Sequence, residues 1–88
     1  MVSKEIIVTN RLGIHARPAT MLVKTAAKFR SKITIKKDDL VVDAKSIMGV
    51  LILAAQKGSK IIIEADGEDE NGALEAVVKL FAEGFGED

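Results

Sequence analysis

Pro18 is the only proline among the 88 residues, and a helical pattern follows it directly. Proline has no backbone N–H to donate, so it is tolerated in the first turn of a helix or outside one. After it, apolar residues recur at the spacing of one helical face: Ala19, Leu22, Val23, Ala26 and Phe29. These positions predict a helix over residues 16–28 with the proline in its first turn.

The only histidine, His15, stands directly before this predicted helix. The first N–H groups of a helix have no partner within it, and with the helix dipole they favour an anion by about 0.3–2 kcal/mol. This positive end disfavours a protonated imidazole, so we expect His15 to be a neutral nucleophile. The amides of Ala16 and Arg17 and the Arg17 guanidinium would hold a phosphoryl group that it accepts. Gly13 can supply an unusual backbone angle at the turn.

A simpler interpretation of these residues stays open at this point. A lone histidine at a helix start is commonly a capping residue, and an isolated arginine is commonly a solvated surface charge. The combination of glycine, histidine, arginine and proline around one helix start favours the phosphoryl site.

Composition excludes several classes of protein. Thirteen basic and thirteen acidic residues balance, and three aromatic residues form no stacking platform, so no nucleic-acid binding is expected. With no cysteine and one histidine, neither a disulfide nor a metal site is predicted, and we expect no cofactor. We expect no signal peptide and no membrane insertion, because the longest apolar run, residues 47–55, is too short for a span. The expectation is a single domain over residues 1–88 in the cytoplasm.

Alternating apolar and polar residues predict four strands. They cover residues 4–9, 31–37, 40–44 and 59–65. Asp38 and Asp39 form a two-residue turn that pairs the second and third strands antiparallel, with Leu40 and Val42 on the buried side. Three consecutive isoleucines at 61–63 predict a central position for the fourth strand.

Two further helices are predicted. Ser46 is a good N-cap and Gly58 a good stop for a short helix that is apolar nearly all round. Its excess apolar surface indicates a contact site, although Ile47 and Met48 could equally just cover the core. The last helix follows the acidic turn at 66–71 and ends at Gly84, after which residues 85–88 are expected to fray. The order β-α-β-β-α-β-α predicts an α+β open-faced two-layer sandwich, a four-stranded antiparallel sheet with three helices on one face.

Two segments resemble motifs of HPr, the histidine-containing phosphocarrier family of the bacterial phosphoenolpyruvate-dependent sugar phosphotransferase system. Residues 13–19, Gly-Ile-His-Ala-Arg-Pro-Ala, are similar to its active-site motif, and residues 45–50, Lys-Ser-Ile-Met-Gly-Val, to its regulatory-site motif. The resemblance extends over the whole chain, including its length and its order of elements. It implies the HPr-like form of the predicted fold.

The resemblance implies a carrier and not an enzyme that turns over alone. Phosphorylated enzyme I would pass a phosphoryl group to Nδ1 of His15, with Arg17 assisting, and the carrier would pass it to the IIA domains of sugar permeases. HPr kinase/phosphorylase would modify Ser46 with ATP, and the modified chain would bind a catabolite-control transcription factor in carbon catabolite repression. Phosphate at a helix N-cap adds about −1.5 to −2 charges, which should act on partners and leave the fold undisturbed.

A docking surface and a monomeric state are expected to accompany the carrier role. The residues expected to flank His15 and contact partners are Leu12, Thr20, Ile47, Met48 and Leu51. This expectation requires the short helix to lie beside the start of the first helix.

Three alternatives remain. The chain could serve a nitrogen-linked phosphorelay, although the segment from Ser46 to Gly49 favours the sugar system; a relative that keeps the serine but lacks the histidine is excluded by His15. It could be an interaction module in which His15 is only a cap. A hydrolase with a histidine nucleophile is the least favoured, because no carboxylate lies in the histidine's segment to orient it.

Overall fold

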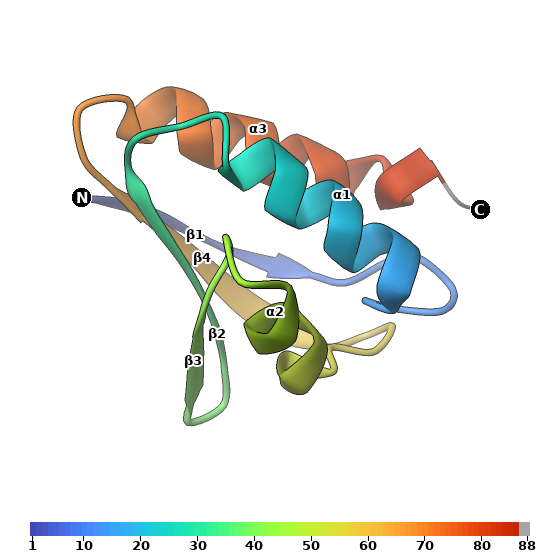
Figure 1. The fold of residues 1–88 in the computed structure, drawn as a ribbon. Coiled ribbons are helices and arrows are strands. Elements are labelled where there is room, and N and C mark those ends of the chain that lie inside the picture. The colour runs from blue at the N-terminus through green and yellow to red at the C-terminus, as the bar shows by residue number, and fades with distance from the viewer. Residues whose placement is uncertain (87–88) are drawn as a thin grey trace.

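The computed structural model describes residues 1–86 as one layer of strands beneath one layer of helices (Figure 1). The elements in chain order are β1 (Val2–Ile7), α1 (Ala16–Ala26), β2 (Lys32–Lys37), β3 (Leu40–Asp43), α2 (Ile47–Leu53), β4 (Lys60–Asp66), α3 (Glu70–Ala82) and a 3₁₀ turn (Gly84–Gly86). The β-α-β-β-α-β-α order is as predicted.

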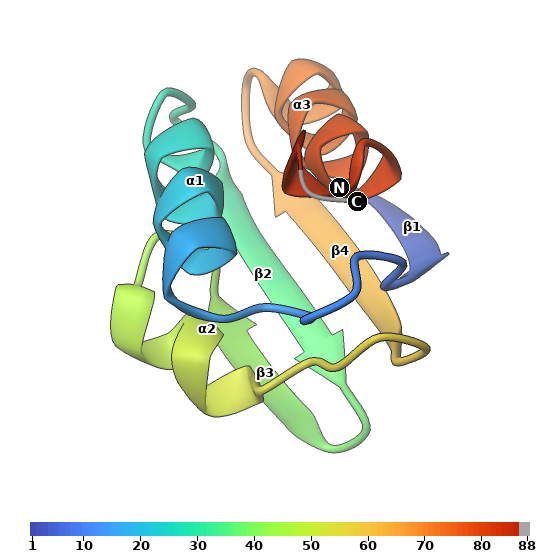
Figure 2. The ribbon, with the colours of Figure 1, turned by 90° about the vertical axis from the view of Figure 1, so that its right-hand side faces the viewer.

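The four strands form one antiparallel sheet in the order β1-β4-β2-β3. β4 therefore lies between β1 and β2, which confirms the central position predicted from its isoleucines. The three helices cover the same face of the sheet, and the other face is open (Figure 2). The predicted open-faced sandwich is confirmed.

The alternation of side chains along the strands separates the core from the open face. Ile33 and Ile35 of β2 and Ile61 and Ile63 of β4 are fully buried beneath the helices. On the open face Lys36 of β2 pairs with Glu64 of the neighbouring β4, with Nζ 3.1 Å from Oε1. The period of two predicted for β2 is therefore correct, whereas the run of isoleucines in β4 did not show that Ile62 lies on the open face between two buried neighbours.

The β2–β3 hairpin has the predicted two-residue turn, because Lys37 pairs directly with Leu40 and Asp38 has a positive φ of 54°. The predicted burial of Leu40 is wrong: its side chain is 40% exposed, whereas Val42 is buried. Leu40 lies at the tip of the hairpin, which extends beyond the helices (Figure 1), so nothing packs over it fully.

Two helices are shorter than predicted. α1 ends at Ala26 because Lys28 and Phe29 donate to the carbonyls of residues three before them, a tighter turn that closes the helix. α2 ends at Leu53 because Ala54 takes the left-handed conformation, φ 50° and ψ 40°. The prediction that Gly58 ends this helix is therefore wrong. Gly58 instead turns the chain into β4.

The expectation that the chain frays from Phe85 onward is wrong for Phe85 itself, because this residue packs into the core. Phe85 is fully buried, and its ring meets that of Phe81 edge to face with 4.8 Å between centroids. Burying an aromatic side chain contributes about 1.5–3 kcal/mol, which offsets the strain of its positive φ of 57°. The rest of the predicted tail, Glu87 and Asp88, lies outside the described residues.

Candidate functional site

His15 is the N-cap residue of α1. Its backbone is extended, φ −109° and ψ −165°, its side chain makes no capping hydrogen bond to the helix, and its carbonyl accepts from the amide of Ala19 at 2.9 Å. The residue as a whole is half-buried, so it stays accessible to a reacting group from solvent.

The first turn of α1 adds two main-chain donors beside this imidazole. Ala16 and Arg17 are both exposed, and their N–H groups precede the first intrahelical bond. Pro18 comes next and is buried, with no N–H of its own. The cluster therefore offers an imidazole, two outward amides and one exposed guanidinium, which is chemistry suited to an anion with several oxygens.

The loop before His15 is fixed by a close main-chain contact with the segment after α2. The amide of Ile14 donates to the carbonyl of Ala55 at 2.8 Å. Gly13 has φ +67°, and a Cβ there would lie 2.5 Å from that same oxygen. Only glycine fits both the backbone angle and the approach, which confirms the role expected of Gly13 and extends it.

Asn10 completes this loop and was not identified from the sequence. It is buried, its Nδ2 donates to the Gly13 carbonyl at 2.6 Å, and its own carbonyl accepts from the Gly13 amide at 3.1 Å. Asparagine at the first position of a β-turn, here residues 10–13, is a recognisable turn signal. The partner carbonyl at Ala55 has no such signal, because the contact joins segments about forty residues apart.

α2 lies beside the start of α1, as the predicted docking surface requires (Figures 1 and 2). The exposed fractions are 69% for Leu12, 38% for Ile47, 65% for Met48 and 39% for Leu51. Thr20 is also exposed, one turn along α1 from Ala16, whose carbonyl its hydroxyl contacts at 2.8 Å. Ile52, 61% exposed, belongs to the same helix and was missed. Met48 does not merely cover the core, because most of its side chain is in solvent.

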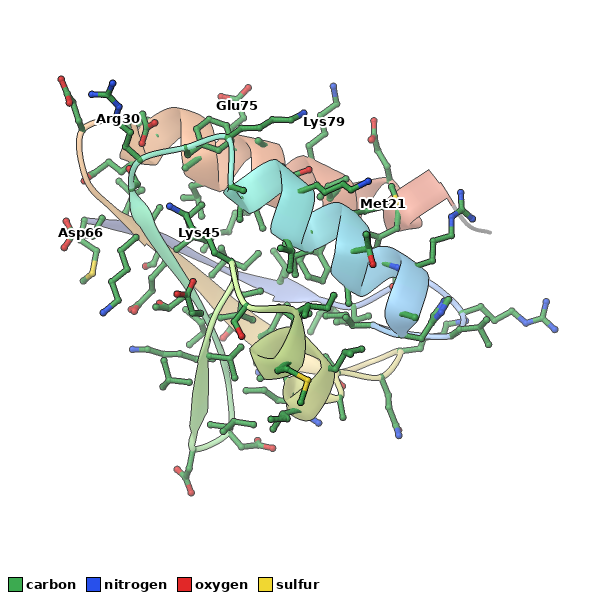
Figure 3. The ribbon with its side chains drawn as sticks, in the orientation of Figure 1. Met21, Arg30, Lys45, Asp66, Glu75 and Lys79 are labelled. Atoms are coloured by element: carbon green, nitrogen blue, oxygen red, sulfur yellow. The ribbon has the colours of Figure 1, made fainter. Side chains whose placement is uncertain are left out.

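Ser46 is the N-cap of α2, as predicted. Its Oγ accepts from the amide of Gly49 at 3.1 Å, and its carbonyl accepts from Val50 at 3.0 Å. Lys45, labelled in Figure 3, reaches from the preceding residue to the carbonyl of Phe29 at 2.8 Å. Ser46 and Ala55 lie at opposite ends of the seven-residue helix, which is about 10 Å long, so Ser46 and the His15 loop adjoin different ends of the apolar surface.

The carboxylates with perturbed pKa values lie at the start of α3 and not beside His15. The Ser31 hydroxyl, then the Arg30 amide, lower the pKa of Asp69 to about 2, and the Gly67 amide lowers the pKa of Glu70. Glu70 also raises the pKa of the N-terminal ammonium, whose nitrogen is 3.1 Å from Oε2. These groups fasten loops to α3 and have a structural role.

Within residues 1–86, no group of three or more His, Cys, Asp or Glu side chains lies close enough together to hold a metal ion. Within the same residues no helix is both long and apolar enough to cross a membrane.

Comparison with known proteins places the chain in a family. The family model described as "PTS HPr component phosphorylation site" matches residues 2–83. The phosphocarrier protein HPr of Xylella fastidiosa is 49% identical over 88 residues, covering 100% of this chain and 99% of the relative. A crystal structure of HPr-C-His from Thermoanaerobacter tengcongensis superposes with a TM-score of 0.96 at 43% identity, covering 100% of this chain and 99% of that one. A second crystal structure, of an HPr dimer from the same organism, has a TM-score of 0.80 at 44% identity and covers 99% and 100%. With a four-stranded sheet, three helices and a histidine at the start of α1, the chain belongs to the HPr family of the phosphotransferase system.

Proposed function

We propose that the chain is a phosphocarrier that holds a phosphoryl group on His15. The observation that carries the proposal is the half-buried His15 at the N-cap of α1, beside the outward amides of Ala16 and Arg17. The phosphoryl group comes from phosphorylated enzyme I. The bond from phosphorus to Nδ1 of His15 forms while the bond to the donor atom of enzyme I breaks, and the reverse exchange delivers the group to a IIA domain.

The geometry around His15 suits a group that must be kept and then released. The two amides and the exposed Arg17 guanidinium compensate the charge of the phosphate oxygens. All three remain in contact with water, so they hold the phosphate more weakly than an enclosed site would. A carrier of this kind needs a partner at each step, and we therefore do not assign it an enzymatic activity of its own.

The apolar surface beside His15 is the proposed docking site for enzyme I and the IIA domains. It consists of Leu12, Thr20, Ile47, Met48 and Leu51, and we include Ile52 because it is also exposed on α2. Exposed apolar groups around a reactive side chain exclude water when a partner covers them, which strengthens the electrostatic contacts at the phosphoryl group. One surface serves successive partners because a phosphohistidine has to be presented to each in the same way.

Ser46 is the proposed regulatory phosphorylation site. A phosphate on its Oγ would stand at the start of α2, where the amide of Gly49 already donates. HPr kinase/phosphorylase would add it, and a catabolite-control transcription factor would bind the product. Negative charge beside Ile47 and Met48 should weaken docking to enzyme I. A Ser46→Asp variant that accepts phosphoryl groups from enzyme I as fast as the parent would contradict this.

We further propose that the chain acts as one HPr domain, as a monomer in the cytoplasm. A freely diffusing carrier can present the same face to every partner only if that face is not occupied by another copy. The crystallised dimer of the T. tengcongensis protein makes this testable. Sedimentation equilibrium across the working concentration range should give the monomer mass, and a dimer under those conditions would refute the monomeric state.

The carrier role is tested with enzyme I and phosphoenolpyruvate. The protein should gain one phosphoryl group that is lost in acid and stable in base, because nitrogen-linked phosphate has that lability. His15→Ala should gain none and keep its circular dichroism spectrum and urea midpoint. Arg17→Gln should still gain the group, at a slower rate. With an active enzyme I, no gain of mass on the parent, or the same gain on His15→Ala, refutes the proposal.

The nitrogen-linked relay is the alternative within the same chemistry. Ser46, Ile47 and Met48 favour the sugar system, since a regulatory serine beside an apolar docking surface connects phosphorylation with partner choice. Competition between purified IIA domains of the two kinds for the phosphorylated chain distinguishes them. Faster transfer to the sugar-permease domain is expected.

A further inference from the structure

We propose that a groove between β1 and α3 binds an extended, acidic–apolar segment of a partner polypeptide as a fifth strand. β1 is an edge strand, since its neighbour in the sheet is β4. α3 packs over the β1–β4 side of the sheet, at the opposite edge from α2 and the proposed docking site (Figure 2). The inference concerns a different surface from His15 and does not depend on the carrier role.

Two adjoining cavities form the groove. One of about 340 Å³ lies between Ile6 of β1 and Val78 and Phe81 of α3, and one of about 370 Å³ lies between Lys4 and Leu74. Lys4 and Val78 line both. Ile6, Leu74 and Val78 are half-buried against the core, so the floor is apolar and preformed.

The exposed edge of β1 supplies main-chain hydrogen-bonding groups along this groove. Both the N–H and the C=O of Val8 bond toward the β4 side, to Ser59 at 2.9 Å and Gly58 at 2.8 Å. Because the two groups of one residue point to the same side of a strand and alternate along it, those of Ser3, Glu5 and Ile7 point to the open edge. An added strand would form hydrogen bonds with this row of edge-facing N–H and C=O groups. The side chains of that strand on the helix side of the sheet would enter the two cavities.

The register of the sheet determines which side chains of the partner face the groove. Lys4 and Ile6 pair with Ile63 and Ile61, which are buried, so their side chains lie on the helix side. A residue opposite Ile6 therefore enters the first cavity and one opposite Lys4 the second, about 7 Å apart along the added strand. The partner residue that enters the first cavity should be apolar, because Ile6, Val78 and Phe81 line that cavity.

The charges around the second cavity favour an acidic residue of the partner opposite Lys4. The charges of β1 also argue against a second copy of this chain as the occupant of the groove. The cations Lys4 and Lys79 outnumber Glu75 around the second cavity, and Glu75 and Lys79 project from α3 (Figure 3). A carboxylate opposite Lys4 is therefore favoured. Two β1 strands that pair about a two-fold axis overlap most fully when the axis passes through Lys4 or Glu5, and both of these registers place like charges directly opposite each other, which is unfavourable.

The test uses a capped ten-residue peptide of alternating valine and threonine with one central glutamate, titrated into the ¹⁵N-labelled full chain. The expected shifts fall on the amides of Ser3, Glu5 and Ile7 and on residues of the groove. Glu5→Pro removes one edge-facing N–H, which an edge strand tolerates, and should weaken binding by about tenfold with the urea midpoint retained. The matched Glu5→Thr keeps the N–H and should bind like the parent. Lys4→Gln should weaken binding of this peptide but not of its glutamine analogue.

Three results overturn the proposal. The first is the absence of shifts on β1 at millimolar peptide, or shifts confined to α1 and α2. The second is equal binding by Glu5→Pro and Glu5→Thr, which would mean that the edge N–H is not used. The third is the same set of shifts on raising the protein concentration without peptide, which would identify a second copy as the occupant. Phosphoryl transfer to His15 should be unchanged in Glu5→Pro, so a failure here and a failure of the carrier role are distinguishable.

Discussion

Replacing Gly13 by alanine should destabilise the fold by two separable effects. A residue other than glycine at φ +67° costs about 1–2 kcal/mol. The new Cβ would also stand 2.5 Å from the Ala55 carbonyl oxygen and 2.8 Å from Cα of Gln56. Both atoms are main chain, so neither can rotate away, and the overpacking costs about a further 1–3 kcal/mol. The expected loss in the free energy of unfolding is about 2–5 kcal/mol.

Gly58→Ala is the matched control for Gly13→Ala. Gly58 has φ +90°, but a Cβ there would have no atom within 4 Å. Its replacement should therefore cost only the backbone penalty of about 1–2 kcal/mol. Urea unfolding at neutral pH measures the free energy of unfolding of both variants. In thermal unfolding the Tm of Gly13→Ala should be lower than that of the parent by about 10 °C or more.

The functional consequence of Gly13→Ala provides a second measurement. Relief of the clash requires the Ile14–Ala55 hydrogen bond to lengthen from 2.8 Å, which moves the residue before His15. The rate of phosphoryl transfer from enzyme I should fall more for Gly13→Ala than for Gly58→Ala. Equal losses of stability in the two variants would refute the argument that the close contact, and not the backbone angle alone, requires glycine.

Three further predictions concern the acidic turn, the last aromatic residue and the cap of α2. Asp69→Asn should lower stability at pH 7. The difference in urea midpoint between parent and variant should close as the pH falls from 3.8 through about 2, because a carboxyl with a lowered pKa stabilises the fold only while it is ionised. A difference that does not depend on pH would contradict this. Phe85→Ala should cost about 3–5 kcal/mol in urea unfolding, whereas a frayed tail would lose almost nothing. Ser46→Ala should cost about 1 kcal/mol and Ser46→Asp much less, since aspartate keeps the acceptor for Gly49; equal losses in the two variants would mean that the side-chain acceptor is not what stabilises the start of α2.

The exposure of the residues in the proposed docking surface could be predicted only in outline. Ile47, Met48 and Leu51 belong to a helix with more apolar residues than one buried face needs, and Leu12 lies in the loop before His15. All four are exposed. The position of α2 beside the start of α1 could not be read from the sequence, because it depends on how the two helices pack. Ile52 was missed because a helix apolar nearly all round does not show which of its residues face solvent.

Local patterns determined much of this protein. Pro18 and the apolar spacing after it placed the start of α1 at Ala16, and hence His15 at its N-cap. Alternation oriented Ile33 and Ile35 toward the core, and the side-chain chemistry of Ser46 identified the start of α2. These features follow from the sequence because each depends on residues within a turn or two of one another.

The tertiary structure decided what depends on contacts between distant segments. The strand order placed β1 at an edge, which left the main-chain groups of Ser3, Glu5 and Ile7 available for an added strand. Ala55 met Gly13 across about forty residues, and Phe85 found space beside Phe81 in the core. No local pattern encodes such contacts, because they form only when packing brings separate elements to within van der Waals distance.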